Sequence, residues 1–430
     1  MASIFGMLGL WVIVKFLFLT VEDNQKANNS AAIFSLLAFT SPFILLFMPM
    51  ARYYSLLMLL TAASIVLKSS KEFKPRTITL TILVDTLLLY TNFIAGLILI
   101  GGDIFLFRVQ RGKLSRINRL LILLVPWVLF IPLMGYLIFT FSKITSQHFF
   151  IADFGSGIKG FVIRIIYTLH DFISGEFLYP WQLSAIIMLA LSLYLVYRFI
   201  RFSNPQSKQA IAWGILAPSI MVIIGSLTLF SLGMEFLPPR IAFAQPFLLC
   251  AIALGIETIS NRKTRLILLV LILLGNLHAD YKLMMRQNFL HSTYIIPWEK
   301  IISDIQRDPP SVKPFVLFDD ESFLYYHEIK GLKISAANMS SPGFYPTLIP
   351  RFPRESIWVI YSPKDITPEH KLKEILITLK KQGYVVTRQY GYLKESDRVR
   401  QIKERLLGRE VPEFKKMAVL FELKNPNNQP

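Results

Sequence analysis

Runs of apolar residues alternate with short polar segments over the first two thirds of the chain. A helix needs about 20 mostly apolar residues to cross a lipid bilayer. The pattern therefore predicts about ten membrane-spanning helices, with a polar Tyr90-Thr91-Asn92 hinge dividing one run that is too long for a single crossing. The expected spans lie near residues 2–20, 31–49, 52–67, 77–91, 93–108, 119–141, 181–199, 210–232, 238–257 and 264–279.

The loop 142–180 contains a further helical pattern, GIKGFVIRIIYTLHDFISG. One stripe of this helix is apolar and the charged residues lie elsewhere on it: Phe161, Ile165, Ile166, Leu169 and Ile173 form the stripe, and Lys159, Arg164 and Asp171 lie off it. Such an amphipathic pattern predicts a helix lying in the outer membrane interface. A small additional core helix fits the same pattern equally well.

From about residue 280 the pattern changes to short β-branched and aromatic runs bounded by turn residues. The runs KPFVLF, SIWVIY, YVVTRQY and MAVLFEL predict strands. Helices are expected after Pro297 and after Thr367-Pro368, the second one ending at Gly383. The chain is therefore predicted to have two domains, a membrane domain at 1–279 and an α/β domain at 280–430.

Composition supports the membrane assignment. The chain of 430 residues is 53% hydrophobic and only 17% charged, whereas soluble proteins contain about 25% charged residues. Its single cysteine, Cys250, lies in an apolar run, which excludes both a disulfide framework and a cysteine-based metal site.

The net charge of +18 comes largely from basic residues grouped beside alternate spans. These groups are Lys68, Lys71, Lys74 and Arg76; Arg108, Arg111, Lys113, Arg116 and Arg119; Arg198, Arg201 and Lys208; and Arg262, Lys263 and Arg265. With ten spans all four groups fall on one side, which is cytoplasmic by the positive-inside rule. This distribution indicates topology rather than nucleic-acid binding. We expect a multi-pass protein of the plasma (inner) membrane, with the N-terminus and residues 280–430 extracytoplasmic.

Arg52 and Tyr54 lie between two apolar runs at the expected outer face, and Arg240 follows Pro238-Pro239 at the same face. An arginine fork binds two phosphate oxygens at once, so the pair suits an amphiphile with a phosphate head. Alternatively, each arginine extends to lipid headgroups or pairs with a carboxylate such as Glu235.

Two aspartates are expected within spans. Asp85 lies in the middle of one and Asp103 toward the cytoplasmic half of the next. Intramembrane carboxylates are found in proton relays. A structural hydrogen bond between helices, or for Asp103 a contact with Arg108, is the alternative.

In the C-terminal domain, Asp319-Asp320-Glu321 follows an expected strand and suits a catalytic or metal site, although helix capping by Asp320 or Ser322 explains it more simply. His327 lies among aromatic residues and is expected to pack. The chain has no Gly-rich phosphate loop, no HExxH and no Gly-x-Ser-x-Gly motif, and we expect neither a metal nor a cofactor.

The stretch SPFILLFMPMARYYSLLMLL resembles a signature of multi-spanning GT-C glycosyltransferases of the family 39-like type, which includes protein O-mannosyltransferases and the lipid A aminoarabinose transferase. Ser41, Pro42, Ala51, Arg52 and Tyr54 match that signature at the same spacing. YTNF at 90–93 and PPRIAFAQPFLL near the last spans are similar to two further family segments in the right order. An extracytoplasmic α/β tail is also typical of the family.

The resemblance implies an inverting transfer of a sugar from a polyprenyl-phosphate carrier to an acceptor on the outer face. A carboxylate in the first extracytoplasmic loop would act as base, and basic groups would hold the carrier phosphate. Mapped onto this sequence, the substrate-binding residues are Arg52, Tyr54, Asn92 and Arg240. The expected partners are membrane lipid and a polyprenyl-phosphate-linked sugar.

The sequence also departs from the family pattern. Pro49 and Met50 replace a Gln-Glu pair, Asn92 replaces a histidine, and Ile241 replaces a tyrosine. Counted back from Arg52, the chain begins at the family's second span, so the catalytic residue stays unassigned. We expect the first span and its loop to be missing from this chain or supplied by a partner subunit. The alternative is a non-catalytic protein of the cell envelope that binds polyprenyl phosphate or acts as a scaffold.

Overall fold

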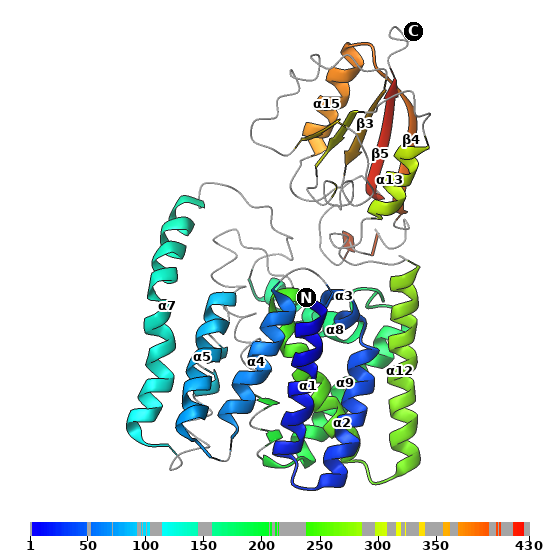
Figure 1. The fold of residues 1–430 in the computed structure, drawn as a ribbon. Helices are drawn as coiled ribbons and strands as arrows, with labels where there is room; N and C mark the ends of the chain where they lie inside the picture. The colour runs from blue at the N-terminus through cyan, green and yellow to red at the C-terminus, as the bar shows by residue number, and fades with distance from the viewer. Residues whose placement is uncertain are drawn as a thin grey trace. The chain divides into compact units, whose positions relative to one another are not determined.

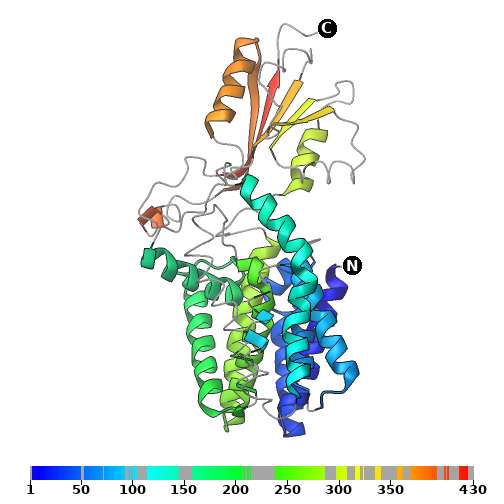
Figure 2. The same ribbon diagram turned by 90° about the vertical axis from the view of Figure 1, so that its left-hand side faces the viewer.

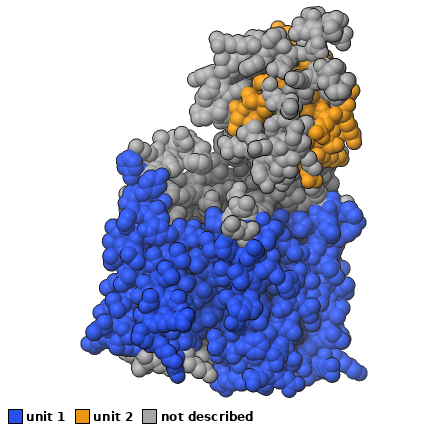
Figure 3. Space-filling view, viewed as in Figure 1, with its two compact units in different colours: residues 1–290 blue, residues 291–430 orange. Residues whose placement is uncertain are grey.

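A computed structural model gives the fold (Figure 1). It describes the chain except for residues 1, 50–52, 71, 93–95, 97, 100, 104–113, 145–156, 206, 209–210, 213, 215–237, 286–296, 308–314, 320–322, 324–334, 340–355, 362–368, 395–400, 403, 406–415 and 425–430. The chain divides into two compact units, residues 1–290 and 291–430, which Figure 3 shows in different colours. The final helix of the first unit continues to Met284, beyond the domain boundary expected at 279.

The first unit is helical. Its described elements are α1 (Ala2–Thr20), α2 (Asn24–Phe39), α3 (Pro42–Phe47), α4 (Tyr54–Lys68), α5 (Pro75–Thr91), α7 (Arg116–Ile144), α8 (Gly157–Ser174), α9 (Leu183–Phe202), η3 (Pro238–Ala244), α11 (Gln245–Glu257) and α12 (Arg262–Met284). Four of these are long and apolar enough to cross a membrane: α1, the first 22 residues of α7, α9 and α12. The outer face of α7 is also apolar, since Leu124, Val128 and Ile131 are more than half exposed. The chain is therefore a membrane protein.

The span expected at 31–49 is not one helix but two, α2 and α3. The break at Thr40 and Ser41 has a local cause, since Pro42 lacks a backbone N–H and Ser41 caps α3 by accepting a hydrogen bond from the N–H of Ile44 over 3.4 Å. At its other end, α2 begins earlier than expected because Asp23 accepts hydrogen bonds from the N–H groups of Gln25 and Lys26.

The span expected at 238–257 is also divided. A 3-10 helix, η3, occupies Pro238–Ala244, and α11 begins at Gln245 with a proline in its first turn. The expected spans at 93–108 and 210–232 lie largely outside the described residues. The span expected at 2–20 matches α1, and the other expected spans correspond to helices with shifted ends.

The amphipathic helix expected in the loop 142–180 is confirmed as α8. In Figure 2 it runs across the ends of neighbouring helices, and it packs against α3, α9, α12 and η3. The polar face of α8 is turned toward the protein interior and not toward solvent. Arg164, Thr168 and Asp171 face inward and are buried, whereas Val162 and Ile166 are 44% and 52% exposed.

The second unit is a five-stranded mixed sheet in the order β2-β1-β3-β5-β4. The strands are β1 (Phe315–Phe318), β2 (Ser335–Asn338), β3 (Ser356–Tyr361), β4 (Val385–Lys394) and β5 (Lys416–Lys424), with helices α13 (Trp298–Gln306) and α15 (Glu369–Lys381). Strand β1 pairs in parallel with β2 and β3, and β5 pairs antiparallel with β3 and β4. The four expected strands and both expected helices are confirmed. Strand β2, with the sequence SAAN, was not predicted because it lacks β-branched and aromatic residues.

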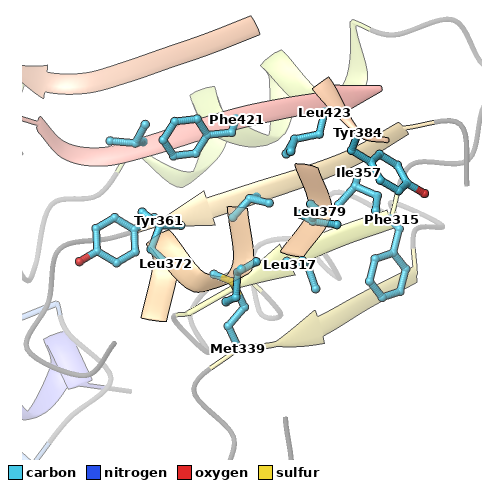
Figure 4. Close-up of a cluster of buried hydrophobic side chains, with 13 residues drawn as sticks. Phe315, Leu317, Met339, Ile357, Tyr361, Leu372, Leu379, Tyr384, Phe421 and Leu423 are labelled. Atoms are coloured by element: carbon cyan, nitrogen blue, oxygen red, sulfur yellow. The ribbon is translucent and has the colours of Figure 1, made fainter. Parts of the chain in front are cut away.

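The two helices cover opposite faces of this sheet, because successive side chains of a strand point to opposite sides. Along β3, Ile357 and Val359 pack in the cluster that includes Leu372 and Leu379 of α15, which Figure 4 shows. Trp358 and Ile360 instead pack in the cluster that includes Ile301 of α13. The unit therefore has its own core on each face of the sheet.

Candidate functional site

The last turn of α8 and the turn after it bring two acidic side chains into the interior of the first unit. Asp171 and Glu176 are both fully buried. Neither carboxylate oxygen of Asp171 has a hydrogen-bond partner among the described residues. The hydroxyl group of Tyr167, one turn before Asp171, donates to Oε1 of Glu176 over 2.5 Å. A buried carboxylate is expensive in free energy unless it is paired or protonated, so Asp171 calls for a functional explanation.

The backbone holds Glu176 in place by an unusual conformation. Gly175 and Glu176 both adopt left-handed backbone geometry, with φ of 60° and 64°. A side chain at Gly175 would approach the backbone N of Phe43 to 2.8 Å, so glycine permits both the turn and the close packing on the Ser41-Pro42-Phe43 segment. Non-glycine residues with positive φ are uncommon and are concentrated at functional sites.

Gln245 connects three segments that are far apart in the sequence. It is fully buried, and its side-chain amide donates to Oγ of Ser41 over 2.9 Å and to the backbone carbonyl of Phe172 over 3.3 Å. The rings of Phe43 and Phe172 also meet edge to face with centroids 5.0 Å apart. The SPF segment, the start of α11 and the end of α8 therefore meet at one end of the bundle, beside the two acids. We call Ser41, Asp171, Glu176 and Gln245 the junction site.

The structure places some of the predicted substrate-binding residues relative to this site. Tyr54, the first residue of α4, is buried with its ring 6.0 Å from that of Phe47 in α3. Arg240 lies in η3, which packs against α4, α8 and α11, and the side chain of Arg240 lies outside the described residues. Arg52 itself also lies outside them. Asn92 is buried at the end of α5, a helix that packs mainly against α4 and α7.

Sequence reasoning missed Asp171 and Glu176 as candidates. Asp171 was expected on the polar side of α8, away from the apolar stripe, and Glu176 was not predicted to be a site residue. A signal was present in HDFISGE, where a Ser-Gly turn separates two acids at the end of an amphipathic helix. That signal does not reveal burial, which comes from packing of α8 against α3, α9, α12 and η3.

Burial and charge set the proton affinity of the junction site. Burial raises the pKa of Asp171 well above its usual value, and the charge of Glu176 raises it further. Burial lowers the pKa of the neighbouring His170 to about 4, so this imidazole is neutral at physiological pH. Asp171 therefore binds a proton more tightly in the folded chain than in the unfolded chain.

This proton affinity predicts a pH dependence of stability. A raised pKa in the folded state stabilises the protein below the unfolded pKa of about 4, and this contribution is lost as the pH rises through the folded pKa. Asn cannot ionise, so Asp171→Asn should raise the melting temperature relative to wild type, with a difference that grows from pH 5 to pH 9. Thermal unfolding in detergent across this range measures it. Asp23→Asn, at an exposed helix cap where Asn serves equally well, should run parallel to wild type. If the melting temperatures of Asp171→Asn and wild type differed by the same amount at every pH, the raised pKa of Asp171 in the folded protein would be contradicted.

A second group of buried charges lies in the same unit, at the opposite end of α4 from Tyr54. Nζ of Lys68 lies 2.9 Å from Oδ2 of Asp85 and 3.4 Å from Oδ1 of Asp103, and Oγ of Ser64 donates to Oδ1 of Asp85 over 2.5 Å. The expected interhelical hydrogen bond of Asp85 is therefore confirmed. Lys68 was expected in a basic loop, and this expectation was wrong, because Lys68 ends α4 and is 1% exposed. A contact with Arg108 was one alternative for Asp103. In the structure Asp103 forms an ion pair with Lys68.

The other residues considered in the sequence analysis provide no second candidate site among the described residues. Asp319 directly follows β1 and is buried, whereas Asp320, Glu321, Ser322 and His327 lie outside the described residues. Cys250 is fully buried and forms no disulfide. Within the part of the chain that the structure describes, no three His, Cys, Asp or Glu side chains are grouped closely enough to hold a metal ion.

No family model and no curated protein matches this chain. Among solved structures, the chain is similar to the cryo-EM structure of the arabinofuranosyltransferase AftD from Mycobacteria, with a TM-score of 0.45 and 12% sequence identity. The similarity covers 99% of this chain and 33% of that one, so the chain spans about a third of the length of AftD.

Proposed function

We propose that this protein is a membrane glycosyltransferase that moves a sugar from a polyprenyl-phosphate carrier to an acceptor at the outer face of the plasma membrane. One observation carries the proposal. Ser41, at the start of the glycosyltransferase-like signature, and Gln245, of the PPRIAFAQPFLL segment, are hydrogen-bonded to each other beside the buried acids Asp171 and Glu176. These acids supply the kind of group that the sequence was expected to lack.

The proposed reaction is a single displacement. The acceptor hydroxyl oxygen bonds to the anomeric carbon of the sugar while its proton passes to the carboxylate of Asp171. The bond between the anomeric carbon and the phosphate oxygen breaks, its electron pair leaves with polyprenyl phosphate, and the configuration inverts. A carboxylate with a raised pKa is a stronger base, which suits proton removal. Asp171 is favoured over Glu176 as the base because Glu176 already accepts a hydrogen bond from the hydroxyl group of Tyr167.

In this proposal Arg52 holds the carrier phosphate by a two-point contact, Tyr54 orients it, and Arg240 and Asn92 complete the binding site. Positively charged groups stabilise the phosphate as negative charge develops on its leaving oxygen. The carrier's isoprenoid chain would lie against membrane-facing helices. A partner subunit that supplies a further span and loop is compatible with this arrangement.

A second function is favoured by the burial of the acids. Asp171 and Glu176 are 0% exposed, and a base must contact the acceptor proton during the reaction. Without an opening motion at the end of α8, the protein would bind polyprenyl phosphate without transferring a sugar. Transfer of radiolabelled sugar from a polyprenyl-phosphate donor by the purified chain in nanodiscs separates the two functions.

The phosphate contact gives a direct prediction that both functions share. Arg52→Ala should weaken polyprenyl-phosphate binding by about 1.5–3 kcal/mol, which is about tenfold or more. Arg52→Lys should recover only part of that loss, since an ammonium group lacks the planar fork. Affinity and melting temperature of the detergent-solubilised variants are measured together, with Arg262→Ala at the exposed start of α12 as the matched control. Unchanged affinity with a lowered melting temperature would show that Arg52 instead supports the fold.

A further inference from the structure

A polar cavity of about 670 Å³ lies at the end of the helical unit opposite the junction site. The turn between α1 and α2, the end of α9 and the turn between α11 and α12 surround it. Helix α2 separates the two sites: Ser41 follows its last turn and Asp23 caps its first. With 16 residues at 1.5 Å each, the two ends of α2 are about 24 Å apart.

The two cations of the cavity each pair with a carboxylate, and a third carboxylate, Glu22, also lines it. Lys26 lies 3.9 Å from the carboxylate of Asp23, and Nη1 of Arg265 lies 2.9 Å from both carboxylate oxygens of Glu257. Lys26 and Arg265 are the two basic side chains among the described residues that line it. A phosphate or carboxylate ligand would have to compete with Asp23 and Glu257 for these cations, so the cavity is poorly suited to an anion.

Most of the other lining side chains are neutral hydroxyls and amides. Ser30 is fully buried within α2, lines the cavity, and its hydroxyl has no hydrogen-bond partner among the described residues. The neutral polar side chains around it come from three parts of the chain and include Gln25, Asn29, Ser203, Ser207, Thr258 and Ser260. Buried polar groups are normally hydrogen-bonded, and a buried hydroxyl without a partner calls for a water molecule or a ligand.

We propose that this cavity binds a neutral polyhydroxylated group, namely a sugar, either as the headgroup of a membrane glycolipid or as a free saccharide. Hydroxyl groups both donate and accept, which matches a lining of hydroxyls and amides in which both cations are already paired with carboxylates. The volume is within the range of pockets that hold a small-molecule ligand. An apolar ligand would leave the buried hydroxyl group of Ser30 without a hydrogen-bond partner. The proposal concerns the opposite end of the bundle from the junction site and does not rest on the proposed function.

The test uses the full chain in phosphatidylcholine nanodiscs that contain a minor fraction of either monoglucosyl-diacylglycerol or phosphatidylglycerol. Native mass spectrometry after release should show retention of the neutral glycolipid and not of phosphatidylglycerol. A parallel titration with methyl glucoside in discs without glycolipid, followed by thermal unfolding, reports binding of the free sugar. Retention of the glycolipid assigns a lipid headgroup, and stabilisation by methyl glucoside alone assigns a soluble saccharide.

Variants connect the binding to the cavity. Ser30→Ala and Asn29→Ala should each weaken binding of the sugar about three- to tenfold, as expected for one lost hydrogen bond. Ser69→Ala is the matched control, because Ser69 is also a buried hydroxyl without a hydrogen-bond partner among the described residues but lies at the end of α4, outside the cavity lining. The exposed Asn29 keeps the test informative if Ser30→Ala fails to fold. Preferential retention of phosphatidylglycerol, no response to either sugar source, or equal losses in all three variants would overturn the proposal.

Discussion

Asp171→Asn is expected to reduce sugar transfer by a factor of about 10² to 10⁴, the range that a positioned general base contributes. Asparagine has nearly the shape of aspartate but cannot take up the acceptor proton. Binding of polyprenyl phosphate should be unchanged, because Asp171 contacts the acceptor and not the carrier in the proposed mechanism. The measurement is initial rate of transfer from a radiolabelled polyprenyl-phosphate donor, alongside carrier affinity.

Two controls make this result specific. Glu176→Gln keeps an acceptor for the Tyr167 hydroxyl group and should lose less activity than Asp171→Asn. Glu72→Gln also changes a carboxylate to an amide, at an exposed position outside both sites, and should transfer at the wild-type rate. Transfer by Asp171→Asn within a few fold of wild type would exclude Asp171 as the base. Because the same substitution is expected to raise stability at high pH, lost activity in a more stable protein could not be attributed to misfolding.

Lys68→Met is expected to produce the largest loss of stability among the substitutions considered. The ammonium group of Lys68 is the shared counter-ion of Asp85 and Asp103, and all three side chains are 6% exposed or less. Removing one member of a buried ion pair costs about 3–5 kcal/mol because it leaves buried charge uncompensated. For a unit of this size that corresponds to a fall in melting temperature of about 6–20 °C.

The control and the rescue follow from the same geometry. Lys74 is highly exposed and pairs with Glu72 at 3.3 Å, so Lys74→Met should change stability by less than about 0.5 kcal/mol. The triple variant Lys68→Met, Asp85→Asn, Asp103→Asn removes the whole charged group and should recover most of the loss. Failure of the triple variant to recover would mean that Lys68 acts through packing, for example against Gly102, rather than through charge.

Local patterns in the sequence were sufficient for the C-terminal domain. The alternation of apolar residues along β3 and the i, i+3, i+4 spacing in α13 and α15 are set by backbone geometry over a few residues. Each strand or helix there has a turn signal close by, such as Gly383, whose φ of 89° suits glycine. For the same reason, the apolar runs of α1, α7, α9 and α12 identified membrane-crossing helices.

The prediction of a single span at residues 31–49 was wrong because of two residues. An average over 19 apolar residues conceals one serine and one proline, yet Ser41 and Pro42 end one helix and begin the next. The break shapes the junction site, because it leaves the Ser41 hydroxyl group free to accept a hydrogen bond from Gln245 of α11. Gln245 and Ser41 are separated by 204 residues in the chain, and no local pattern relates them.

The sequence by itself determined the class of protein, the amphipathic character of α8 and the presence of acids at its end. Only the tertiary structure decided that the polar face of α8 turns inward, that Lys68 is a buried counter-ion rather than a loop residue, and that Asp171 and Glu176 lie beside Ser41 and Gln245. The physical reason is that an amphipathic pattern shows that the two faces of a helix differ. It does not show what each face contacts. Where one side of a helix meets lipid, burying the polar face against other polar groups is the arrangement of lower free energy. The identity of those groups depends on contacts between distant parts of the chain.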